Sequence, residues 1–84
     1  MIKILYFARI KEALGLGQES VALPMDVRDV TGLTSLLRQR GERWQNELAP
    51  GKALRVAVNQ TMVGMDAVIE DDDEIAYFPP VTGG

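Results

Sequence analysis

The two most hydrophobic strand-like segments of this chain lie at its opposite ends, and this arrangement constrains the fold more than any other feature. Residues 2–8 and 74–78 are rich in β-branched and aromatic residues, and both alternate with the period of two that is typical of strands. Between them, one segment has the apolar spacing of a substantial helix, namely Val30, Leu33, Leu36 and Leu37. A chain of 84 residues has room for one domain. We therefore expect both end strands to share one sheet with that helix.

The remaining predicted elements are short, and most end at a Gly, a Pro or a polar turn. Asp29 is a suitable N-cap for the main helix, and Gly41 is a candidate for the left-handed cap at its other end. The other expected elements are helical turns at 9–14 closed by Gly15, a strand at 19–23 ended by Pro24, a short helix and a Pro50-Gly51 turn within 42–52, strands at 54–58 and 62–63 joined by a tight connection at 59–61, and a turn at 70–73.

This order of elements predicts an α+β domain in which a mixed sheet packs on one main helix. The ubiquitin-like β-grasp fits, because its first and last strands lie side by side in the centre of the sheet. Pro79 and Pro80 stop the last strand, since a proline cannot donate to a strand ladder. We therefore expect a β-grasp domain over residues 1–78 and an extended Gly-Gly tail over residues 79–84.

The composition excludes several classes of function. The absence of Cys and His removes disulfides, thiolate ligands, cysteine nucleophiles and the usual general base. The net charge of −3 disfavours a nucleic-acid partner, and no apolar run approaches the ~20 residues of a membrane span. We expect a cytoplasmic protein with no bound metal or cofactor and no membrane partner.

Two further features have ordinary structural interpretations. The acidic run at 70–74 lacks the alternating ligands, the Gly and the final Glu of an EF-hand, so it predicts a solvated turn rather than a metal site. Steering of a basic partner is the alternative. Trp44 is expected to pack at the edge of the core.

Strict alternation predicts an apolar patch on the face of the sheet opposite the helix. If the helix covers Ile2, Ile4, Tyr6, Leu54, Val56, Val58, Ile75 and Tyr77, then the residues that point outward are Leu5, Phe7, Ala57, Ala76 and Phe78. An exposed apolar patch of this kind favours docking onto a partner protein. The alternatives are ordinary surface residues or a register shifted by one residue.

The C-terminal sequence has a chemical use of its own. Gly83 and Gly84 follow the proline pair, so the end predicts a slim arm whose carboxylate can enter a narrow channel. A carboxylate is a poor electrophile until ATP converts it into an acyl-adenylate, which a sulfur or nitrogen nucleophile can then attack. A frayed tail without function is the alternative.

Three segments resemble the small, sulfur-carrying subunit of molybdopterin synthase, the MoaD family. They are residues 1–8, residues 58–61 and the ending Phe78-Pro79-Pro80-Val81-Thr82-Gly83-Gly84. The likeness runs along the whole chain, and the Phe-Pro-Pro-Val lead-in is its most specific part. The resemblance implies a sulfur carrier for molybdenum cofactor biosynthesis that has no catalytic groups of its own.

The resemblance also implies partners and site residues. A ubiquitin-activator-like adenylyltransferase would use ATP to adenylate Gly84, and a sulfur donor protein would convert the adenylate into a thiocarboxylate. The large synthase subunit would receive the tail in a heterotetramer and pass the sulfur to cyclic pyranopterin monophosphate. By position, Phe7, Met62 and Phe78 match the hydrophobic contacts with the partner. The alternatives are a thiamin-type sulfur carrier, a ubiquitin-like protein modifier, or an interaction module with an inert tail.

Overall fold

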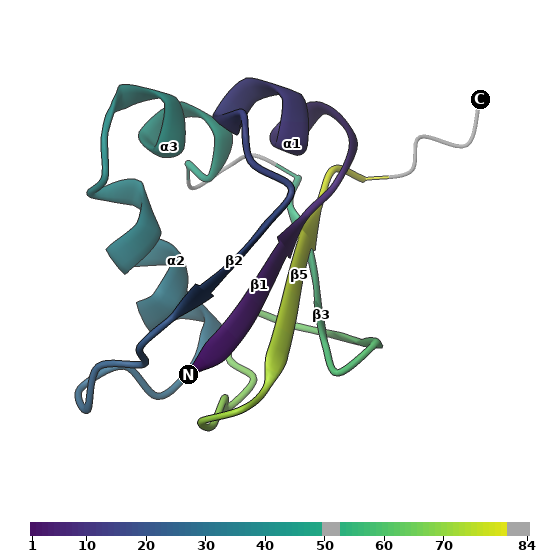
Figure 1. Ribbon diagram of the computed structural model, residues 1–84. Coiled ribbons are helices and arrows are strands. Elements are labelled where there is room, and N and C mark those ends of the chain that lie inside the picture. The colour runs from purple at the N-terminus through teal and green to yellow at the C-terminus, as the bar shows by residue number, and fades with distance from the viewer. Residues whose placement is uncertain (50–52, 81–84) are drawn as a thin grey trace.

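The computed structural model describes residues 1–49 and 53–80 of the chain (Figure 1). Two features expected from the sequence lie outside these residues, namely the turn at Pro50-Gly51 and the tail residues Val81, Thr82, Gly83 and Gly84. The elements are β1 (Ile2–Tyr6), α1 (Ala8–Leu14), β2 (Gln18–Val21), α2 (Val30–Arg38), α3 (Glu42–Glu47), β3 (Arg55–Val58), β4 (Thr61–Val63) and β5 (Glu74–Phe78).

The two end strands pair with each other in the interior of the sheet, as the sequence predicts. Within the described ranges the strands form one five-stranded sheet in the order β2-β1-β5-β3-β4. β1 and β5 are parallel, whereas the other neighbouring pairs are antiparallel. Helix α2 contributes to the core on one face, and α1 and α3 lie near the end of the sheet where β1 and β5 finish (Figure 1). This α+β topology confirms the predicted β-grasp.

Helix α2 begins where its cap is expected. The Asp29 carboxylate accepts a hydrogen bond from the Gly32 backbone N–H at 2.8 Å, which satisfies one of the free donors of the first turn. Val30, Leu33 and Leu37 lie on one stripe and are fully buried. The cap therefore defines the start of the helix, and the apolar stripe attaches it to the sheet.

Replacing Asp29 with Ala should lower the free energy of unfolding by about 1 kcal/mol, because the Gly32 donor loses its partner. Urea denaturation followed by circular dichroism measures the change. Asp26→Ala is the matched control, since it removes the same charge from an exposed position in the same loop. Equal destabilisation by both substitutions would show that charge, and not the cap, is responsible.

The other end of α2 differs from the prediction. The helix ends at Arg38, and its C-cap Gln39 keeps a right-handed conformation, so Gly41 is not a left-handed cap for this helix. Gly41 is instead the N-cap of α3, and its carbonyl accepts a hydrogen bond from the Gln45 N–H at 3.0 Å. The short spacing between the two helices makes one glycine compatible with either role.

The first strand is shorter than expected, and the first helix begins earlier. β1 ends at Tyr6 rather than Ala8, and Ala8 opens α1 with a positive φ of 53°. Gly15 closes α1 in the left-handed conformation, as predicted, and its N–H donates to the Lys11 carbonyl at 2.9 Å. Phe7 thus occupies the corner between strand and helix.

The predicted tight connection is a two-residue turn between β3 and β4. Asn59 and Gln60 both have positive φ, of 50° and 70°, as in the hairpin turns that match the strand twist. The Asn59 side chain donates to the Asp73 carboxylate at 2.9 Å and accepts from the Glu74 N–H at 3.0 Å. The hairpin is therefore tied to the acidic segment, which forms the expected turn.

Both tyrosines lie in the core with their hydroxyl groups hydrogen-bonded. Tyr6 donates to Glu19 at 2.7 Å, and the Tyr77 and Thr34 hydroxyls are 2.8 Å apart. The Trp44 and Tyr6 rings meet edge to face at a centroid distance of 5.6 Å, which confirms the predicted place of Trp44 at the edge of the core. Burial raises the pKa of both phenols well above the ordinary value of 10.0, and the hydrogen bond to Glu19 raises that of Tyr6 further.

These tyrosines should make the fold unstable at alkaline pH. Because the folded-state pKa of each is raised, their contribution to stability is complete below pH 10.0 and is lost as the pH rises above it. We expect tyrosinate absorbance to appear together with loss of the circular dichroism signal, and Tyr6→Phe to move the transition to higher pH. Ionisation of both tyrosines near pH 10.0 in a fully folded chain would contradict this prediction.

Candidate functional site

The face of the sheet opposite α2 carries a continuous row of apolar side chains. In the pairing register Leu5 lies beside Ala76, Ala76 beside Ala57, and Ala57 beside Met62, so the row crosses four strands. The alternate residues point the other way and belong to the core or pack against it: Ile4, Ile75, Val56 and Val63. The register therefore confirms the alternation that was predicted from the sequence.

Two phenylalanines extend this row toward the end of the sheet. The rings of Phe7 and Phe78 meet edge to face with a centroid distance of 6.3 Å, and the Phe7 N–H donates to the Tyr77 carbonyl at 3.1 Å. Phe7 is 48% exposed, although its side chain is large and apolar. We call the whole set the outer apolar face; it consists of Leu5, Phe7, Ala57, Met62, Ala76 and Phe78.

Two members of the outer apolar face are less accessible than alternation alone suggests. Ala57 and Ala76 are only 7% and 9% exposed. They point outward as predicted, but their side chains are short and lie in the row between Leu5 and Met62. The accessible part of the face is therefore concentrated at its rim, where Phe7 and Met62 are about half exposed.

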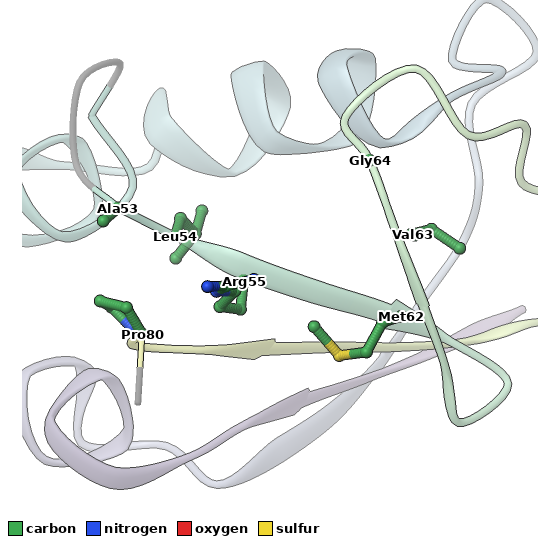
Figure 2. Close-up of a pocket in the computed structure, with 7 residues that line it drawn as sticks. All are labelled: Ala53, Leu54, Arg55, Met62, Val63, Gly64 and Pro80. Atoms are coloured by element: carbon green, nitrogen blue, oxygen red, sulfur yellow. The ribbon is translucent and has the colours of Figure 1, made fainter. Parts of the chain in front are cut away.

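Shallow pockets lie on both sides of the outer apolar face, and each includes a cationic residue. On the β1 side the lining residues include Phe7, Lys11 and Gln18. On the β4 side a pocket is lined by Ala53, Leu54, Arg55, Met62, Val63, Gly64 and Pro80 (Figure 2). Sequence reasoning missed Arg55 and Lys11. Arg55 could have been found, because it lies two residues before Ala57 and opposite Phe78 on the same face.

The tail begins beside this face. Pro79 and Pro80 follow Phe78 directly and line a small cavity with Arg9 and Glu47, whose side chains approach to 3.8 Å. Of the predicted site residues, the structure thus brings Phe7, Phe78 and the two prolines to one end of the sheet, and places Met62 on its β4 edge. The predicted reactive residue Gly84 lies outside the described residues.

The part of the chain that the structure describes holds no group of three or more acidic, His or Cys side chains arranged to bind a metal ion. No helix in residues 1–49 or 53–80 is both long and apolar enough to cross a membrane.

Comparison with known proteins identifies the family. The ThiS family model matches residues 4–84, and the molybdopterin synthase sulfur carrier subunit of Escherichia coli K12 is 44% identical over 84 residues, covering 100% of both chains. The chain belongs to the ThiS family. A putative molybdopterin converting factor subunit 1 from Pyrococcus furiosus has the same fold with a TM-score of 0.76; it is 28% identical, over 95% of this chain and 97% of its own.

A further ThiS-like fold comes from a complex of subunits 1 and 2 of molybdopterin-converting factor from Helicobacter pylori. One chain of that complex matches with a TM-score of 0.67 and 24% identity, over 99% of this chain and 97% of its own. That likeness concerns the fold alone. The E. coli relative, which matches at much higher identity, confirms the resemblance to the sulfur carriers of molybdopterin synthase that the sequence segments indicated.

Proposed function

We propose that this chain is the sulfur carrier subunit of a molybdopterin synthase. The observation that carries the proposal is the outer apolar face, which adjoins the base of the tail in a chain that aligns from end to end with a named sulfur carrier subunit. A carrier needs a surface that its partners can bind and a reactive group that reaches away from that surface. The face supplies the first requirement, and the sequence beyond Pro80 supplies the second.

The chemistry takes place at the carboxyl group of Gly84. One carboxylate oxygen attacks the α-phosphorus of ATP on an adenylyltransferase, pyrophosphate leaves, and an acyl-adenylate forms. The terminal sulfur of a persulfide on a sulfur donor protein then attacks the acyl carbon, and AMP leaves. A thiol cleaves the resulting S–S bond and releases the thiocarboxylate. Gly83 and Gly84 suit this exchange because neither has a Cβ to obstruct the narrow active sites of the partner enzymes. The chain itself contributes no general base to these steps.

The outer apolar face is the surface that docks on the large synthase subunit. Phe7, Met62 and Phe78 supply the contacts, because covering the exposed parts of these aromatic and thioether groups with a partner removes apolar surface from water. Lys11 and Arg55, at the flanking pockets, are placed to meet acidic groups around the edge of the contact. Docking there would direct the tail into the partner, where sulfur passes to cyclic pyranopterin monophosphate. The proposal also includes assembly of the chain with the large subunit into a heterotetramer. The location proposed for it is the cytoplasm, where ATP is available.

Reconstitution with purified partners tests the function. With an adenylyltransferase and ATP, intact mass spectrometry should show an adenylate on the chain, and a sulfur donor should then exchange one oxygen of Gly84 for sulfur. The thiocarboxylated chain plus the large subunit should produce molybdopterin, whereas the isolated chain should have no turnover. Transfer to thiazole synthase instead would support the thiamin-type alternative, and an amide bond to a target lysine would support a protein modifier. Either result without molybdopterin would refute the proposal.

A further inference from the structure

One docking residue has a reactivity that the proposed function does not use. The chain has no Cys, so its four methionine thioethers are the sulfur atoms that its side chains offer to an oxidant. All four methionines are exposed: Met1, Met25, Met62 and Met65. They differ in what surrounds them, and only one of them belongs to the outer apolar face.

Met62 lies at the β4 end of the row formed by Leu5, Ala76 and Ala57. Its side chain is 51% exposed and extends toward Arg55 in the pocket that Pro80 also lines (Figure 2). Met62 is therefore half exposed to solvent in the free chain, at the place where a docked partner would cover it. Its neighbours on the same row are hydrocarbon groups, which offer no hydrogen bond to a polar atom.

The other methionines lie elsewhere. Met25 is 95% exposed in the segment between β2 and α2, and β2 is the sheet edge opposite to β4. The Met65 backbone carbonyl accepts hydrogen bonds from the N–H and the hydroxyl of Thr31 at the start of α2. Oxidation at these positions would change surfaces on the side of α2, away from the outer apolar face.

We infer that Met62 is an oxidation site through which peroxide weakens docking of the carrier to the large subunit. This inference rests on the proposed function. A thioether lone pair of Met62 attacks one oxygen of a hydroperoxide, the O–O bond breaks, and the second oxygen leaves with the transferred proton as water or an alcohol. Sulfur loses two electrons to the peroxide and gains one oxygen. A methionine sulfoxide reductase returns the thioether at the expense of a dithiol.

The sulfoxide weakens docking because it is polar where the surface is apolar. In solution water can hydrate the new oxygen, but in the docked state Ala57 and the other neighbours on the row provide no side-chain donor for it. The Arg55 guanidinium lines the same pocket, but the proposed docking engages it with acidic groups of the partner. A buried polar group without a hydrogen-bond partner costs enough to lower affinity about tenfold or more. The same oxidation at Met25 leaves the docking surface unchanged.

The experiment uses the full chain in its carboxylate form, so that no terminal sulfur consumes the oxidant. Wild type, Met62→Leu and Met25→Leu are treated with hydrogen peroxide, which is removed before the untreated large subunit is added. Peptide mass spectrometry measures the sulfoxide at each methionine, calorimetry measures affinity, and circular dichroism checks the fold. Each treated protein is compared with its own untreated sample.

We expect about a tenfold or greater loss of affinity for oxidised wild type and oxidised Met25→Leu, and none for oxidised Met62→Leu. Incubation with a methionine sulfoxide reductase should restore wild-type binding. Unchanged binding by wild type with a confirmed sulfoxide at Met62 would overturn the inference. An equal loss in oxidised Met62→Leu, or failure of the reductase to restore affinity, would also overturn it. If untreated wild type does not bind the large subunit, the proposed docking itself fails before any peroxide is used.

Discussion

Deletion of Gly84 should abolish sulfur transfer while leaving the affinity for the large subunit unchanged. If the Gly84 carbonyl must reach a reacting centre inside the partner, the deletion leaves the new terminus short by about one extended residue, roughly 3.5 Å. A misplacement of even ~1 Å can cost about a hundredfold in a positioned reaction. The outer apolar face is untouched by the deletion, because its residues end at Phe78.

Adding one residue after Gly84 should have the same effect for a different reason. The Gly84 carbonyl then belongs to an amide, which cannot be adenylated. Gly83→Val should bind normally and transfer slowly, because its branched side chain meets the walls of the partner's channel. Complex formation and molybdopterin synthesis are measured side by side. Near-normal synthesis by the extended chain, with its extra residue confirmed by mass, would rule out the terminal carboxyl as the working group.

Replacing Phe7 or Phe78 with Asp should weaken binding to the large subunit by about 2 kcal/mol or more, roughly thirtyfold. Each substitution puts a carboxylate where an aromatic ring now contributes to the outer apolar face, and docking would bury that charge without a partner. The fold should survive at Phe7 in particular, whose side chain is 48% exposed. Calorimetry measures the affinity, and circular dichroism measures the fold.

Val68→Asp is the matched control for these substitutions. Val68 is also an exposed apolar residue, but it pairs with Asp29 at the start of α2 and not with the strands of the outer apolar face. Its substitution should leave binding unchanged. Unfolding of both phenylalanine variants would place these rings in the core, and equal losses in all three variants would show that any added charge weakens the complex.

Local sequence patterns predicted most of the fold correctly because each depends on a few neighbouring residues. Asp29 caps α2, and Asn59 and Gln60 turn the chain between β3 and β4. Element boundaries were less accurate. The role of Gly41 was wrong because a glycine between two helices suits the end of one as well as the start of the next, and only the packed positions of α2 and α3 decide between them.

Which residues point to each face of the sheet follows from the amino-acid sequence, because side chains alternate along a strand whatever its neighbours are. The proposed chemistry at Gly84 likewise rests on sequence features, namely the proline pair after β5 and the Gly-Gly motif. The register of β5 with β1 and with β3 depends on the folded sheet, because these strands are distant in sequence. That register covers Ala57 and Ala76, leaves Phe7 and Met62 half exposed, and places Arg55 beside Met62. The accessibility of a side chain depends on its neighbours across the sheet, and no local sequence pattern predicts how distant strands pair.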